Sequence, residues 1–126
     1  MAERSADWMD LAHARHDLES EFYEWACFSS QQAAEKAAKA VLNRRGAEAW
    51  GHSVADLIRE IGRFVVLRPD LLDAAFELDK AYTPTRYPDA HQTGSPSTRY
   101  TRTEAQRMVE HAARIVSACE DLLSAD

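Results

Sequence analysis

Residues 101–123 read TRTEAQRMVEHAARIVSACEDLL and carry the clearest helix signal in the chain. Apolar residues recur there at intervals of three and four, which places them along one side of a helix. They are Ala105, Met108, Ala112, Ile115, Cys119 and Leu122. Thr101 and Glu104 form a capping box, a pair that satisfies backbone N–H groups at a helix start. The stretch therefore predicts an amphipathic helix that runs on to the C-terminus.

The two segments before this helix also show helical signals. Pro69 suits the first position of a helix, where its missing N–H leaves no bond unmade. The apolar side of that helix comprises Leu71, Ala75, Leu78 and Tyr82. Ser53 with Asp56 three residues later resembles a capping box and predicts the start of a shorter helix. The apolar side of the shorter helix comprises Val54, Leu57, Ile58 and Ile61.

Two further helices are predicted nearer the N-terminus, from Ala6 to about Ser20 and from about Glu21 to Arg45. The second ends before Gly46, a residue that suits a helix C-terminus. Small alanines on its apolar stripe allow close helix–helix approach. That stripe comprises Phe22, Ala26, Ala33, Ala37 and Val41. Four or five helices with mostly short connections predict an all-α, antiparallel up-and-down bundle, formed by a single domain over residues 1–126.

Composition limits the classes of function. The chain has 126 residues, 45% of them hydrophobic and 29% charged, which is ordinary for a globular domain. No run of about 18 apolar residues is present, and the N-terminus lacks a signal-peptide pattern, so we expect a cytoplasmic protein without membrane contact. Cys27 and Cys119 lie in apolar helical patterns and are expected to be buried and reduced. No cysteine or histidine spacing indicates a metal site, and no cofactor is expected.

A formal net charge of −6 argues against broad, sequence-independent binding of nucleic acid. The 15 lysines and arginines still permit a local basic pocket. The segment from Thr83 to about Tyr100 is predicted to be irregular because it contains Pro84, Pro88, Gly94 and Pro96. Structureless segments of this length inside a domain are commonly functional. It also holds Arg86, Tyr87, Asp89, His91 and Arg99.

Two segments resemble the HEPN domain family. Residues 29–40, SSQQAAEKAAKA, resemble the signature second helix of the family, and residues 82–91, YTPTRYPDAH, resemble the loop before its last helix. His52-Ser53, which opens a helix after a glycine-bearing turn, matches as well. The resemblance covers essentially the whole chain. It implies a helical bundle that forms a homodimer with facing clefts.

The resemblance also implies partners and activities. Small HEPN proteins are often encoded beside a minimal nucleotidyltransferase, and the pair looks like a toxin–antitoxin module. Many relatives are metal-independent ribonucleases that carry Arg, four to six residues and then His. The branch with Arg-Tyr-Pro-Asp is associated with nucleotide or substrate binding for the partner enzyme. Some modules are silenced when the partner attaches AMP to a tyrosine, so Tyr87 or Tyr100 is a hypothetical acceptor.

The ribonuclease spacing occurs twice, and the pair Arg86 and His91 lies where the family motif belongs, unlike Arg45 and His52. Histidine suits transfer of the 2′-hydroxyl proton, and arginine suits the developing charge on phosphorus. Against this, Pro88 prevents the pair from sharing a regular helix face, and Tyr87 replaces the polar residue usual in ribonuclease members. Asp89 would then pair with Arg86 and hold the loop.

Three interpretations therefore remain open. The first is a binding partner of a nucleotidyltransferase, with nucleotide or RNA held by Lys36, Lys39, His52, Arg86, Tyr87 and Asp89, beside His91. The second is a metal-independent endoribonuclease toxin with Arg86 and His91 as catalytic residues. The third is a structural dimer that does no chemistry, with its loop held by pairing of Arg86 and Asp89. In the corresponding interpretation of the second helix, Gln32, Glu35, Lys36 and Lys39 form a solvated face with intrahelical ion pairs. The tryptophans and several other aromatic residues are expected in the core or in an interface.

Overall fold

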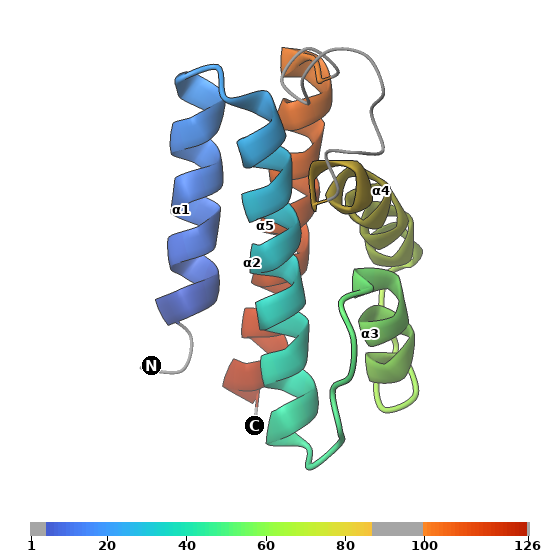
Figure 1. Cartoon of the computed structure of the whole chain (residues 1–126). Coiled ribbons are helices and arrows are strands. Elements are labelled where there is room, and N and C mark those ends of the chain that lie inside the picture. Colours follow the sequence, from blue (N-terminus) through green and yellow to red (C-terminus); the bar gives the residue numbers. More distant parts are fainter. Residues whose placement is uncertain (1–4, 87–99, 126) are drawn as a thin grey trace.

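The computed structural model describes residues 5–86 and 100–125, with side chains for 7–81 and 100–125. Helices α1 (Ser5–Glu19), α2 (Tyr23–Arg44), α3 (Val54–Ile61), α4 (Pro69–Arg86) and α5 (Arg102–Ala125) account for most of these residues (Figure 1). The described residues contain no strand. The all-α prediction is therefore confirmed. No helix in this part of the chain is long and apolar enough to cross a membrane.

The long helices alternate in direction along the chain. Figure 1 shows α1 running against α2, and α4 returning the chain to the end at which α5 begins. The short α3 packs beside α4 on one side of the bundle. Helix α2 contacts all four other helices, so it forms the centre of the fold. This up-and-down path is the predicted bundle.

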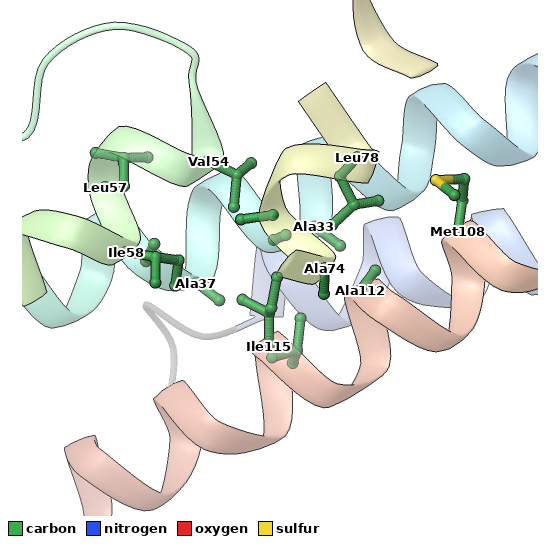
Figure 2. Packing of buried hydrophobic residues seen from close by; sticks show 14 of the residues in the cluster. Ala33, Ala37, Val54, Leu57, Ile58, Ala74, Leu78, Met108, Ala112 and Ile115 are labelled. Carbon is green, nitrogen blue, oxygen red and sulfur yellow. The ribbon is translucent and has the colours of Figure 1, made fainter. Parts of the chain in front are cut away.

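The core is built around small residues on α2. Ala33 and Ala37 are fully buried, and Figure 2 shows them in one cluster with buried apolar side chains from α3, α4 and α5. The surrounding side chains labelled there are Val54, Leu57, Ile58, Leu78, Met108 and Ile115. Methyl side chains at the contact let neighbouring helices approach closely. The predicted cores of α3 and α5 are thus confirmed, as is burial of Cys27 and Cys119, both free thiols.

Both predicted helix starts carry the expected cap. The Ser53 hydroxyl accepts a hydrogen bond from the Asp56 N–H at 3.2 Å, and the Thr101 hydroxyl accepts one from the Glu104 N–H at 3.0 Å. Each bond satisfies a backbone donor that has no partner within its own helix. The capping patterns therefore located the starts of α3 and α5 correctly.

Two expectations about the helices are wrong. The irregular segment was expected from Thr83, but α4 continues through Pro84 to Arg86. A proline near a helix end removes one backbone bond without preventing the final turn. Phe22, expected on the buried stripe of α2, is exposed at the start of that helix.

The large aromatic residues were expected in the core or in an interface, and several of them do not lie in the core. Besides Phe22, five aromatic residues of the described part are exposed: Trp8, Trp25, Trp50, Phe64 and Phe76. Because alanines fill the centre of the bundle, the helices approach too closely to enclose rings of this size. Their role in an interface stays a prediction.

Candidate functional site

A carboxylate buried on α2 forms the centre of the candidate site. Glu35 is only 6% exposed, yet it accepts hydrogen bonds from three side chains. Its donors are Lys39 Nζ at 2.8 Å, His52 Nδ1 at 3.1 Å and Gln31 Nε2 at 3.3 Å. Gln31 and Lys39 lie four residues before and after Glu35, on the same side of the helix. A buried charge requires this kind of pairing, because its desolvation would otherwise cost several kcal/mol.

Gln31 joins this cluster to the segment that precedes α3. Its Nε2 donates to the backbone carbonyl of His52 at 2.7 Å, and its Oε1 accepts from Gln32 Nε2 at 2.8 Å. The Gln31 side chain is fully buried, so these bonds satisfy polar atoms that water does not reach. Gln31 and Glu35 thus hold His52 by its backbone and by its ring.

The cluster opens to solvent through His52 and Lys39. The His52 side chain is 57% exposed and that of Lys39 is 28% exposed, compared with 7% for the Glu35 side chain. Lysine and protonated imidazole both donate hydrogen bonds to phosphate oxygens. The arrangement therefore presents two donors at the surface, fixed by an anion beneath them.

Helix α4 binds the start of α3, the segment that directly follows His52. The Asp79 carboxylate accepts hydrogen bonds from Ser53 Oγ and from the backbone N–H groups of Val54 and Ala55. Arg86, the last residue of α4, follows Asp79 by seven residues, about 10 Å along the helix. The backbone of Arg86 therefore lies about two helical turns from the point where α4 meets the start of α3.

The structure separates the predicted binding lysines. Lys39 and His52 meet at Glu35, whereas Lys36 pairs with Asp10 of α1 at 2.7 Å. The Lys39–Glu35 pair is an intrahelical ion pair, as the solvated-face interpretation expected, but Glu35 is buried and not solvated. The Arg86 side chain and the residues Tyr87, Asp89 and His91 lie outside the described part, so their predicted roles stay predictions.

Tyr100, one of the two hypothetical acceptors of AMP, is buried at the start of α5. Its hydroxyl donates to the Ala81 carbonyl at 3.5 Å, and only 7% of the residue is exposed. Burial, followed by the nearby Cys27, Glu104 and Glu24, raises the pKa of Tyr100 to about 12. A buried, protonated phenol is a poor nucleophile, so this state of the protein disfavours Tyr100 as the acceptor.

Two further features bear on ligand binding. Within the described ranges, no three His, Cys, Asp or Glu side chains are grouped so as to hold a metal ion. An open groove of about 490 Å³ runs between the segment before α4 and helix α5, lined by Leu67, Arg68, Leu71, Ala113, Arg114 and Ala118. Asp70 lies 3.2 Å from Arg68 and 4.0 Å from Arg114, and so offsets both arginines.

The sequence pattern did not identify Gln31 as a member of the cluster. It grouped Gln32 with Glu35, Lys36 and Lys39, whereas the row at the site is Gln31, Glu35 and Lys39, with a regular spacing of four. The spacing of four was the feature of the sequence that could have identified this row. Nothing local identified Asp79, because its partners lie at least 24 residues away in the sequence.

Comparisons with known proteins agree with this fold. The family model of the HEPN domain matches residues 5–122. The protein TT1696 from Thermus thermophilus is 42% identical with a TM-score of 0.90, over 96% of this chain and 95% of that one. A HEPN domain protein from Thermotoga maritima is 52% identical with a TM-score of 0.81, over 98% of each chain.

ST0689, an archaeal HEPN homologue, is 38% identical with a TM-score of 0.79, over 95% of this chain and 93% of that one. No curated protein matches. Because the family model spans nearly the whole chain and these structures agree in fold and sequence, the chain belongs to the HEPN domain family.

Proposed function

We propose that this HEPN protein is a cytoplasmic homodimer that binds a nucleotide or RNA phosphate as the partner of a minimal nucleotidyltransferase. The pair would form a toxin–antitoxin-like module. The binding cleft is built around Lys39 and His52, above Glu35, with the end of α4 beside it. Arg86, Tyr87, Asp89 and His91 complete the cleft, and Lys36 lies on its α1 side.

The burial of Glu35 beneath the partly exposed side chains of Lys39 and His52 is the observation that carries this proposal. An apolar side chain of similar size would fill a buried position without the desolvation cost of a carboxylate. Glu35 instead organises Lys39 and the His52 ring at the surface. Such an arrangement suits recognition of an anion, for which preset donors lose little entropy on binding.

The net charge of −6 fits local rather than broad recognition. Lys39 offsets the charge of Glu35, and Arg86 adds a further cation to the cleft. The net negative charge of the chain as a whole repels the rest of a long nucleic acid. We therefore expect binding of a nucleotide or a short RNA end in preference to duplex DNA.

A binding titration tests the proposal. Purified protein is titrated with AMP, ATP and a short single-stranded RNA bearing a 5′-phosphate, and the dissociation constants are compared among variants. Lys39→Met and Arg86→Ala should each weaken binding by about tenfold, as expected for a lost charge-assisted hydrogen bond. Arg63→Ala is the control, because Arg63 is exposed and pairs only with its neighbour Glu60 at 3.4 Å in the described structure.

Equal affinities in the wild-type protein and in both cleft variants would contradict the proposal. Thermal melting of every variant shows whether a loss of binding reflects unfolding. If Lys39→Met fails to fold because the buried Glu35 loses its lysine partner, Arg86→Ala still decides the outcome.

The second candidate is a metal-independent endoribonuclease with Arg86 and His91 as catalytic residues. The sequence spacing from Arg86 to His91 favours it, because it matches the Arg/His spacing of the family's ribonuclease members. Incubation of the purified protein with total RNA in EDTA separates the two candidates. Cleavage that is lost in both Arg86→Ala and His91→Ala would establish the ribonuclease, whereas binding without cleavage supports the binding partner.

A further inference from the structure

We propose that the groove between the segment before α4 and helix α5 binds an amphipathic helix of a partner protein. The bound helix carries apolar residues along one face, with an acidic residue at one end of this face and a basic residue about two turns away. The inference goes beyond the proposed function, because the groove shares no residue with the nucleotide cleft.

The first argument is the apolar surface that the groove leaves open. Its apolar lining comes from two parts of the chain that are far apart in sequence, namely Val66, Leu67 and Leu71 on one side and Ala113 and Ala118 on the other. Val66 is fully exposed, whereas Leu71 is buried and lies at the base of the groove. Apolar surface that is gathered in a concave site is a common feature of protein–protein interaction surfaces.

The second argument is the spacing of the groove residues on α5. Arg114, Ser117, Ala118 and Asp121 follow one another at intervals of three and four, so they form one stripe along the helix. From Arg114 to Asp121 the stripe extends over about 10 Å, or two helical turns. The small side chains of Ser117 and Ala118 at its centre let a second helix approach closely. A groove of this length suits a helix that lies along it.

The third argument is the charge at the two ends of the groove. At one end, Arg68 and Arg114 share the single carboxylate of Asp70, at 3.2 and 4.0 Å, so one positive charge is left over. Among the described residues Arg68 pairs only with Asp70 and only through Nε, which leaves its two terminal nitrogens to bind a carboxylate. At the other end, the exposed Asp121 side chain has no ion pair within the described part of the chain. The opposite charges of the groove therefore match an acidic and a basic residue on the bound helix.

The shape of the groove favours a partner helix over two other occupants. A second copy that used the same surface would place one groove against the other, and two concave surfaces do not fill each other. A small molecule is usually enclosed by its site over most of its surface, whereas this groove is open along its length. A convex helix that continues beyond the groove meets both conditions.

A titration with a synthetic helical peptide tests the proposal. The probe carries leucines along one face, a glutamate at one end of that face and a lysine seven positions later. The ¹⁵N-labelled full-length protein should show saturable changes in the amide chemical shifts of Leu67, Ala113 and Ala118. No saturable change at these amides with millimolar probe would overturn the proposal.

Reversal of one charge tests the orientation of the charged ends. Arg68→Glu should weaken binding of the probe by about threefold to fivefold, the size expected for one exposed ion pair. A second peptide, with lysine in place of the glutamate, should bind Arg68→Glu more tightly than it binds the wild-type protein. Arg63→Glu is the matched control, because Arg63 is exposed, lies outside the groove and gives the same change of net charge. Equal affinities of both peptides for the wild-type protein and for Arg68→Glu would overturn the charge match.

A blocking variant tests the position of the bound helix. Ser117→Trp places a large side chain in the groove from an exposed position and should abolish binding of the probe. Gln106→Trp, at an exposed position of α5 outside the groove, should leave binding unchanged. Thermal melting shows whether both variants fold, and Arg68→Glu decides the outcome if Ser117→Trp does not. Unchanged binding in a folded Ser117→Trp would overturn the proposal. A wild-type oligomer that binds no probe and is dissociated by Ser117→Trp would also overturn it and assign the groove to a second copy.

Discussion

The carboxylate of Asp79 on α4 accepts a hydrogen bond from the Ser53 hydroxyl at 2.9 Å, and it thereby joins α4 to the start of α3. The same carboxylate accepts the backbone N–H groups of Val54 at 2.8 Å and Ala55 at 3.0 Å. A negative charge at a helix N-terminus satisfies its free donors and interacts favourably with the helix dipole. One side chain thus fixes the helix that begins next to His52.

Asp79→Ala should lower the free energy of unfolding by about 2 kcal/mol, because it leaves two backbone donors and a hydroxyl without their acceptor. Urea denaturation followed by circular dichroism measures the change. Asp73→Ala is the matched control, since Asp73 is an exposed residue of the same helix, and it should shift stability by less than about 0.5 kcal/mol. A similar effect of the two substitutions would contradict the capping role of Asp79.

Ser30→Ala should stabilise the protein. The Ser30 side chain is fully buried on α2, and its hydroxyl has no hydrogen-bond partner within the described structure. Removing an unsatisfied buried hydroxyl and adding a better helix former should raise the free energy of unfolding by about 1 kcal/mol. Ser29→Ala, at a half-buried neighbouring position, controls for helix propensity alone. A loss of stability in Ser30→Ala would indicate a hydrogen bond at this hydroxyl.

Ala37→Leu should destabilise the fold by roughly 1–3 kcal/mol, because the added carbon atoms have no space between α2 and the helices around it. Ala37 is fully buried, and Figure 2 shows it within the packed cluster. Ala40→Leu, at a half-buried position on the same helix, should have a smaller effect. Thermal melting compares the two variants, and equal melting temperatures would show that the core has room at Ala37.

Alkaline pH should weaken the fold through Cys27. Burial, followed by Glu104 and Glu24, raises the pKa of Cys27 from 9.0 to about 12. An unfolded chain therefore loses this proton at lower pH than the folded chain. The stabilising effect of the neutral thiol is complete below pH 9 and is lost as pH rises through 12.

Urea denaturation at pH 8 and at about pH 10.5 measures this effect. The wild-type protein should lose about 2 kcal/mol more between these pH values than Cys27→Ala, which has no thiol to ionise. Tyr100, whose pKa also rises to about 12, contributes in the same direction above pH 10. Equal losses in the two proteins would show that the Cys27 pKa is the same in both states.

Much of the fold could be predicted from the sequence, because the residues that set the helix starts and the apolar helix faces lie close together in the chain. The capping patterns at Ser53 and Thr101 and the apolar spacing after each of them act within a few residues. The exposure of Trp25 and Trp50 was not accessible, since it depends on how closely the alanines of α2 let the helices approach.

The candidate site was accessible only in part. Lys39 and His52 were recognised, but their meeting point at Glu35 depends on the rotation of α2 and on the path of the chain between α2 and α3. A rotation that buries Gln31 in place of Gln32 also turns Lys36 toward Asp10 of α1. Such tertiary relationships are not encoded in the spacing of one helix.

The most direct test of the proposed cleft is a map of amide chemical shifts in the wild-type protein during titration with AMP. Binding at the cleft predicts the largest changes at Lys39, His52 and Ser53, with little change along the groove at Leu67, Ala113 and Ala118. Changes centred on that groove, or no saturable change at millimolar AMP, would contradict a phosphate-binding cleft above Glu35.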